Sequence, residues 1–334
     1  SVEPGSETSS FLQGEQNMGI NWRAYIAELA LIGATALWGS SFVAMKVAVD
    51  AFDPLLVILA RMVLGSLVFA VMARRFGSVR SVYQKGDVFR ILFMALCEPG
   101  LYFTCEAYAM QYTSASQAGM ITAMLPIMVA VSAALLLKER MRAKAWFGLG
   151  LAALGVVWLT VSSTPDESAP NPVLGNGLEL LAMVFATGYM ISLKKLTGRY
   201  SPWFLTAMQS FIGCVYFLPA LFFPWTEYPS TWEFWPVVSV FYLGLIVTIG
   251  GYGLYNLGMS HTQASRAASY INLIPVFAVL MGWWLLGESF SLVQIAASGL
   301  VFAGVFLSSG KSDNTQSGPV ASESGTSDTT SFPT

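Results

Sequence analysis

The stretch MQYTSASQAGMITAMLPIMVAVSAALLLKE at residues 110–139 recurs as MSHTQASRAASYINLIPVFAVLMGWWLLGE at residues 259–288, and this repetition decides how the fold is interpreted. The two stretches align without gaps at an offset of 149 residues. The identical pairs at this offset include Met110 and Met259, Thr113 and Thr262, Ala115 and Ala264, Ser116 and Ser265, Ala118 and Ala267, Pro126 and Pro275, Glu139 and Glu288, Gly39 and Gly188, Lys46 and Lys195, Gly150 and Gly299, and Gly155 and Gly304. A repeat of this length predicts that the chain is a duplication of one structural unit.

The composition places this duplicated chain in a lipid bilayer. Of the 334 residues, 55% are hydrophobic and 11% are charged, whereas soluble domains carry roughly 25% charged residues. The apolar residues form long runs, and a run of about 20 is long enough to cross a membrane as a helix. We predict an all-α integral membrane protein with ten transmembrane helices, at residues 24–45, 54–73, 88–109, 112–137, 144–162, 175–196, 202–223, 235–257, 264–286 and 291–309.

The duplication also predicts the domain organisation. Each repeat holds five spans, at residues 24–162 and 175–309, with an outer linker at residues 163–174. Because five is an odd number, the second copy enters the membrane from the opposite side, so the two five-helix repeats are inverted. Inverted repeats permit alternating access, although channels contain them too. Residues 1–23 and 310–334 are polar and are predicted to be disordered cytoplasmic segments.

Basic residues predict the orientation. With the N-terminus inside, fifteen of the 17 lysines and arginines lie in or beside cytoplasmic segments. The exceptions are Lys46, on the outer side, and Arg61, within the second predicted span. The predicted outer loops carry acidic residues instead, including Asp166, Glu167, Glu227 and Glu233. We therefore expect a multi-pass protein of the plasma (inner) membrane with both termini in the cytoplasm.

Several classes of function lack the residues that they need. The three cysteines lie in apolar segments without metal-ligand spacing, so no metal site is predicted. The single histidine, His261, leaves few options for triad or general-base chemistry, so we do not predict an enzyme. No glycine-rich nucleotide-binding loop is present, and we expect no cofactor and no nucleic acid as a partner.

Four short motifs resemble those of the drug/metabolite transporter superfamily, in particular its ten-span exporters with two EamA-type repeats. Leu37-Trp38-Gly39-Ser40-Ser41-Phe42 is similar to the family's "WGS-F" signature, and Arg61 stands where the family usually has an arginine. The fourth span and its repeat in the ninth resemble the family's small-residue start, mid-helix proline and terminal glutamate. The resemblance implies secondary export of amino acids, drugs or other metabolites. The related plastid phosphate translocators use late basic residues, and the single Arg266 of the ninth span disfavours an organophosphate.

Polar residues that occur in only one repeat are candidates for substrate or ion handling. Arg61 aligns with Ser210, Glu98 with Val247 and Glu106 with Tyr255. A charge inside a span costs at least ~2.5 kcal/mol unless it is paired or faces water. The acidic pair therefore either holds Arg61 in a structural ion pair, or Glu98 takes up and releases a proton during transport.

Other side chains extend this candidate pathway. We expect it to be lined by Trp38, Ser41, Arg61, Glu98, Tyr102, Glu106, Gln209, Tyr255, Asn256, Tyr270 and Asn272, with Ser40 and Tyr252 nearby. Pro126 and Pro275 match across the repeats, and either serve as structural kinks or act as gates. Gly148, Gly150, Gly155, Gly299 and Gly304 are expected to allow close helix packing.

The leading hypothesis is a secondary transporter that exports amino acids or related small metabolites by alternating access. Its expected partners are a small-molecule substrate, the lipid bilayer, protons as a coupling ion, and a second copy in a homodimer. The alternatives are a passive channel or a membrane-embedded transferase.

Overall fold

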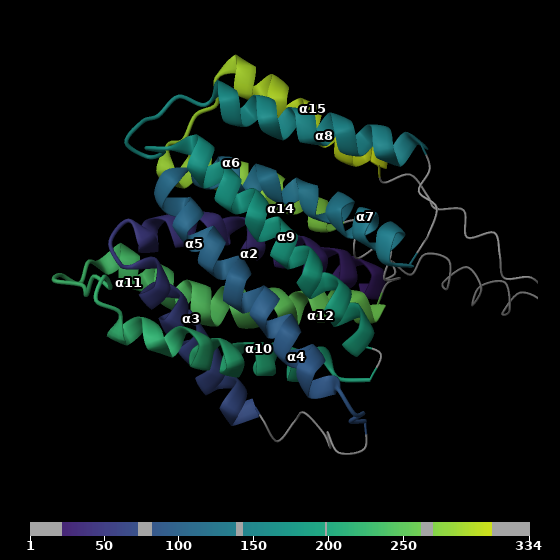
Figure 1. The fold of residues 1–334 in the computed structure, drawn as a ribbon, viewed down its shortest axis with the longest axis vertical. Coiled ribbons are helices and arrows are strands. Elements are labelled where there is room, and N and C mark those ends of the chain that lie inside the picture. The colour runs from purple at the N-terminus through teal and green to yellow at the C-terminus, as the bar shows by residue number, and fades with distance from the viewer. Residues whose placement is uncertain (1–21, 73–81, 138–142, 198, 262–269, 309–334) are drawn as a thin grey trace, which may run out of the picture.

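The computed structural model describes residues 22–72, 82–137, 143–197, 199–261 and 270–308 (Figure 1). Every element of this part of the chain is helical; η3 and η6 are π-helical, and η4, η5 and η7 are 3₁₀ turns. The elements are α2 (Trp22–Val49), α3 (Pro54–Met72), α4 (Asp87–Ala95), η3 (Leu96–Leu101), α5 (Tyr102–Tyr112), α6 (Ala115–Ile121), η4 (Thr122–Met124), α7 (Leu125–Leu137), α8 (Ala143–Ser162), α9 (Pro172–Leu196), α10 (Pro202–Phe217), η5 (Leu218–Phe222), α11 (Phe234–Phe241), η6 (Tyr242–Gly251), α12 (Tyr252–His261), η7 (Ile271–Leu273), α14 (Ile274–Leu286) and α15 (Leu292–Ser308).

The all-helical membrane class is confirmed. Seven stretches of the described chain are long and apolar enough to cross a bilayer, and three shorter apolar helices accompany them at Trp146–Ser162, Ile271–Leu286 and Leu292–Leu307. The count of ten spans stays a prediction. Large apolar side chains such as Leu67, Val71, Phe222 and Phe306 are exposed, as expected for a bundle whose surroundings are lipid.

Several helices begin at residues other than those predicted, because capping side chains determine where they start. The sixth predicted span began at residue 175, but α9 begins at Pro172, since Asn171 accepts a hydrogen bond from Leu174 N and proline suits the first helical position. The fourth began at residue 112, whereas Ser114 caps the start of α6. The predicted disordered segments 1–23 and 310–334 lie outside the described residues, except that α2 already includes residues 22 and 23.

The structure reproduces the repeat in its irregular turns. The 3₁₀ turns η4 and η7 lie 149 residues apart, directly before the helices that contain Pro126 and Pro275 near their starts. The π-helical segments η3 and η6 interrupt the third and eighth spans at overlapping repeat positions. Both pairs of irregularities therefore belong to the duplicated unit.

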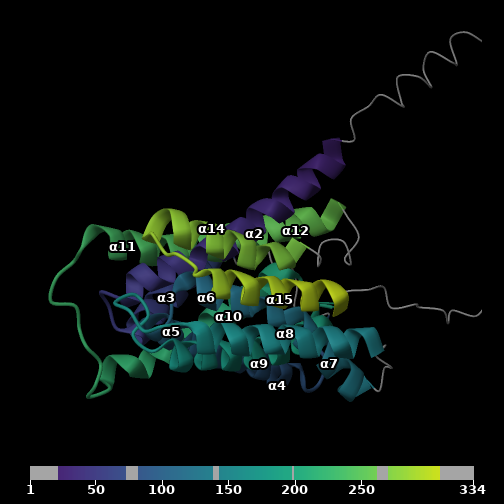
Figure 2. The same ribbon diagram turned by 90° about the horizontal axis from the view of Figure 1, so that it is seen from above.

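Helices α8 and α15, the last of each repeat, pack against each other along one side of the bundle in both views (Figures 1 and 2). A Cβ atom added to Gly155 would lie 2.7 Å from Val301 N, and one added to Gly304 would lie 2.6 Å from Gly148 O. The packing prediction holds for Gly155 and Gly304. It is wrong for Gly150 and Gly299, which have open space where a Cβ would stand.

We expect Gly304→Ala to lower the free energy of unfolding by about 1–3 kcal/mol, the usual cost of overpacking, since the new methyl group meets the backbone of α8. Gly299→Ala on the same helix is the matched control and should not be destabilising. Thermal unfolding of the purified protein in detergent compares them. Equal losses in both variants would show that the interhelical contact is not responsible.

A glutamate at the end of α14 joins the two repeats. Glu288 accepts hydrogen bonds from Ala115 N at 2.8 Å and Ser116 N at 2.9 Å, and so caps the start of α6. This contact gives Glu288 a structural role at the junction of the two repeats. Its repeat partner, Glu139, lies outside the described residues.

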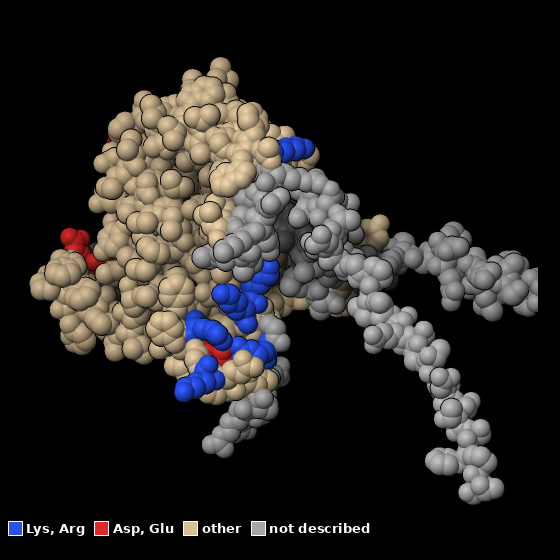
Figure 3. All heavy atoms as spheres, turned by 45° about the vertical axis from the view of Figure 1, so that its right-hand side comes forward, with Lys and Arg blue, Asp and Glu red and all other residues tan. Residues whose placement is uncertain are grey.

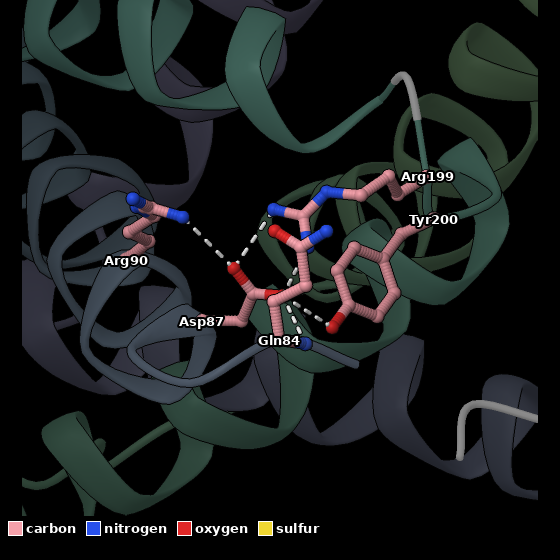
Figure 4. A network of polar contacts seen from close by, with 5 residues as sticks. All are labelled: Gln84, Asp87, Arg90, Arg199 and Tyr200. Carbon is pink, nitrogen blue, oxygen red and sulfur yellow. Dashed lines mark hydrogen bonds and ion pairs between the residues drawn. The ribbon is translucent and has the colours of Figure 1, made fainter. Parts of the chain in front are cut away.

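Basic side chains gather at one end of the bundle, which we call the basic end (Figure 3). Buried Asp87, at the start of α4, fixes this end by accepting hydrogen bonds from Arg199 at 2.6 and 2.8 Å and from Tyr200 at 2.9 Å (Figure 4). Arg90 adds an ion pair at 3.1 Å. These contacts hold the third span to the turn between α9 and α10.

Candidate functional site

The candidate site forms where the third span is interrupted. Glu98 lies about 16 Å along this span from its first residue, at a 1.5 Å rise per residue, and has extended torsion angles, φ −146° and ψ 119°, inside η3. Pro99 follows it and cannot donate a backbone hydrogen bond. The Glu98 carbonyl lacks its usual helical partner at the break, since the Tyr102 N–H donates to Cys97 and Pro99. It accepts a hydrogen bond from Gln209 Nε2 at 3.0 Å. The break thus frees polar backbone near the middle of the third span, next to a carboxylate.

A polar cavity lies at this break, between the two repeats. The first repeat lines it with Arg61, Met62, Glu98, Pro99 and Phe103, and the second with Thr206, Gln209, Ser210, Thr248 and Tyr252. Arg61 and Ser210, which occupy equivalent repeat positions, face the same space. The cavity has a volume of about 20 Å³, which is room for about one water molecule. This conformation therefore leaves no space for a metabolite at the site.

Arg61 is buried but makes no ion pair within the described residues. Its guanidinium lies 4.2 Å from the centre of the Phe103 ring, a cation–π contact, and Nε donates a 3.4 Å hydrogen bond to Thr248 Oγ1. It also interacts electrostatically with Glu98 and Glu106. The close structural ion pair that we considered from the sequence is absent from this part of the chain, so most of the guanidinium donors remain available.

The carboxylates extend from the cavity away from the basic end of the bundle. Glu98 accepts a 3.3 Å hydrogen bond from Tyr252 OH, and Glu106 accepts a 2.8 Å bond from Tyr102 OH. Glu179, on α9, is fully buried, interacts with Glu106, and has neither carboxylate oxygen hydrogen-bonded within the described residues. Sequence reasoning missed Glu179, although it aligns with Ala30 and so meets the same criterion that selected Glu98.

Aromatic rings cover one side of the site. Trp38 contacts Tyr252 and Tyr255, with ring centres 5.6 and 5.2 Å apart. The motif that carries the family resemblance therefore borders the residue that hydrogen-bonds Glu98. Ser41 does not line the cavity, and its hydroxyl donates a hydrogen bond to the Trp38 carbonyl of its own helix.

The remaining predicted residues do not line the cavity. Asn256 Nδ2 and Asn272 Oδ1 are buried without hydrogen-bond partners in the described chain, and Tyr270 immediately precedes η7. Pro126 and Pro275 lie near the starts of α7 and α14, also outside the cavity. Their roles in a pathway or as gates stay predictions.

A polar cavity between duplicated halves, beside a broken helix near mid-membrane, is the arrangement of a secondary transporter. The EamA-like transporter family matches the chain twice, at residues 25–161 and 173–310. The chain therefore belongs to the EamA-like transporter family, as the resemblance of its motifs predicted.

Relatives extend over most of the chain. "Uncharacterized transporter YetK" of Bacillus subtilis (strain 168) is 25% identical, over 89% of this chain and 91% of the relative. The "S-adenosylmethionine/S-adenosylhomocysteine transporter" of Chlamydia muridarum (strain MoPn / Nigg) is 29% identical, over 81% of this chain and 86% of the relative. A solved crystal structure with 21% identity aligns at a TM-score of 0.56, over 84% of this chain and 95% of the other, and supports the fold alone.

Proposed function

We propose that this transporter exports amino acids or closely related small metabolites across the plasma (inner) membrane by alternating access, with protons as the coupling ion. The observation that carries the proposal is the small cavity between the repeats, in which Arg61 and Glu98 face the same space. An intramembrane carboxylate and arginine are costly, and such residues are kept where they handle substrates or protons.

The two charges complement a zwitterion. The guanidinium of Arg61 has donors for a substrate carboxylate, since the described structure pairs it only with Thr248 and the Phe103 ring. Glu98 can accept from a substrate ammonium group, and the rings of Phe103 and Tyr252 can contact an apolar side chain. The Chlamydia relative supports this class, because S-adenosylmethionine carries an amino-acid head group.

Glu98 is the proposed coupling residue. It is the cavity's carboxylate, and the Tyr252 hydroxyl bound to it comes from the other repeat. A substrate ammonium and a proton would compete for the same carboxylate oxygens. Because the substrate and the proton cannot bind Glu98 at the same time, export of the substrate is coupled to entry of a proton.

The alternatives have less support. A passive channel needs a continuous opening, whereas the cavity here has room for about one water molecule. A membrane-embedded transferase needs a nucleophile with a base, and His261 lies exposed at the end of α12, outside the cavity.

The deciding experiment is counterflow in proteoliposomes that contain the purified protein. Vesicles preloaded with unlabelled amino acids, one kind per batch, and with S-adenosylmethionine in a separate batch, are diluted into trace labelled substrate. We expect saturable, transient accumulation for at least one zwitterion, and none for its decarboxylated amine. Non-saturable equilibration of all solutes would instead indicate a channel, and protein-free vesicles give the leak rate.

A further inference from the structure

A second, wider recess lies on the outside of the bundle at the basic end, between α4 and α9. It has a volume of about 320 Å³, and its walls include Phe89, Phe93, Ile191 and Ser192. Phe89 is 75% exposed and Phe93 45%, so the recess opens sideways to the surroundings of the bundle. It shares no residue with the cavity of the candidate site. We call it the lateral groove.

The two ends of the lateral groove differ in chemistry. Arg90 and Lys195 line it within about one helical turn, roughly 5 Å, of the start of α4 and the end of α9. Phe93 and Ile191 lie about one turn further along these helices, toward the middle of the membrane. The groove therefore has a cationic mouth at the bundle's basic end and an apolar interior facing the bilayer.

The positive charge of the mouth is not neutralised. The carboxylate of Asp87 already accepts two hydrogen bonds from Arg199, and it also forms the ion pair with Arg90. One negative charge therefore faces two positive charges, and the Arg90 side chain stays 51% exposed. Lys195 makes no ion pair within the described residues, and its side chain is exposed. Among the residues that the structure describes, no acidic side chain lines the groove. An anion placed between Arg90 and Lys195 would meet excess positive charge.

We propose that the lateral groove binds one anionic phospholipid, with the phosphate between Arg90 and Lys195 and an acyl chain along Phe93 and Ile191. A soluble phosphate would use the mouth but leave the apolar walls uncovered, and a neutral lipid would leave the two cations unpaired. Only an anionic lipid matches both ends. Basic recesses between transmembrane helices are suited to such head groups.

This lipid would touch both repeats. Its phosphate would link α4 of the first repeat to α9 of the second, next to the Asp87 contacts that already join the third span to the turn after α9. A ligand that binds only the folded protein raises its stability by an amount that grows with the logarithm of its affinity. Anionic lipid should therefore stabilise the purified protein, and neutral lipid should do so less.

The test is native mass spectrometry of the full chain in detergent, titrated with phosphatidylglycerol or with phosphatidylcholine of the same acyl chains. We expect one phosphatidylglycerol to bind tightly, with a matching rise in the thermal unfolding midpoint. Lys195→Gln should weaken this binding about fivefold, and Arg90→Gln with Lys195→Gln about 30-fold, from about 1 kcal/mol for each basic residue. Lys194→Gln, an adjacent exposed lysine outside the groove, is the matched control and should change little.

Each of three results would overturn the proposal. Equal binding of phosphatidylcholine would remove the role of the cations. Glycerol phosphate that competes as strongly as the lipid would assign the mouth to a soluble anion. An equal loss in Lys194→Gln and Lys195→Gln would show diffuse attraction instead of a defined groove. If loss of Arg90 disturbs the Asp87 contacts, the Lys195→Gln variant still tests the groove, because Lys195 makes none of those contacts. None of these measurements depends on the transported substrate.

Discussion

Glu98→Gln should abolish the pH dependence of transport in proteoliposomes and prevent uphill accumulation driven by a proton gradient. Glutamine retains the shape of the side chain and can accept a hydrogen bond from Tyr252, but it takes up no proton in the working range of pH. Substrate exchange at equal concentrations should persist, because exchange does not require net proton movement. Labelled-substrate uptake with and without an imposed gradient, over a range of pH, measures both effects.

Other titratable groups lie near Glu98 and need controls. Arg61 on α3, Glu106 on α5, Tyr189 on α9 and Tyr252 on α12 interact with it electrostatically. Glu106→Gln tests whether the coupling belongs to Glu98 alone, and Glu167→Gln, between α8 and α9, is a control for loss of a carboxylate elsewhere. Wild-type coupling in Glu98→Gln would remove this residue from the mechanism.

Arg61→Gln should raise the half-saturation concentration for a zwitterionic substrate about 10- to 150-fold, since a hydrogen bond to a charged group contributes about 1.5–3 kcal/mol. The loss arises because the substrate carboxylate no longer meets a guanidinium. Arg61→Lys should recover only part of the affinity, because an ammonium cannot bind both carboxylate oxygens in a planar fork. Concentration dependence of counterflow measures these values.

An amine that lacks the carboxylate separates binding from folding. If the wild-type protein recognises the carboxylate through Arg61, then inhibition of counterflow by the decarboxylated amine should be unchanged or stronger in Arg61→Gln. Equal loss for the zwitterion and the amine would assign Arg61 to a structural role, in which it supports Phe103 and Thr248. Thermal unfolding of each variant checks that the fold is intact.

Several features were available from the sequence because they are one-dimensional. Runs of apolar residues predicted the membrane class, and the offset of 149 residues predicted the duplication, which the paired turns η4 and η7 repeat. The motifs around Trp38 and Arg61 predicted the family. Helix ends were less predictable, since caps such as Asn171 depend on a single side-chain hydrogen bond.

Which polar residues meet in space was decided by the packing of the helices. Glu98, Gln209 and Tyr252 are distant in sequence and converge only because η3 breaks the third span and the second repeat packs against it. Asn256 and Asn272 satisfied the same sequence criterion but lie outside the cavity, whereas Glu179 was overlooked and is buried beside Glu106.

The sequence alone determined that this protein lies in a lipid bilayer, that it is duplicated and which family it belongs to. Apolar runs, repeats and short motifs can all be recognised along the chain without knowledge of its folding. The tertiary structure alone decided that Arg61 has no close acidic partner in the described chain, and that Glu98 lines the same small cavity. Such pairings depend on distances of a few ångströms between separate helices, since electrostatic and hydrogen-bond energies fall steeply with separation.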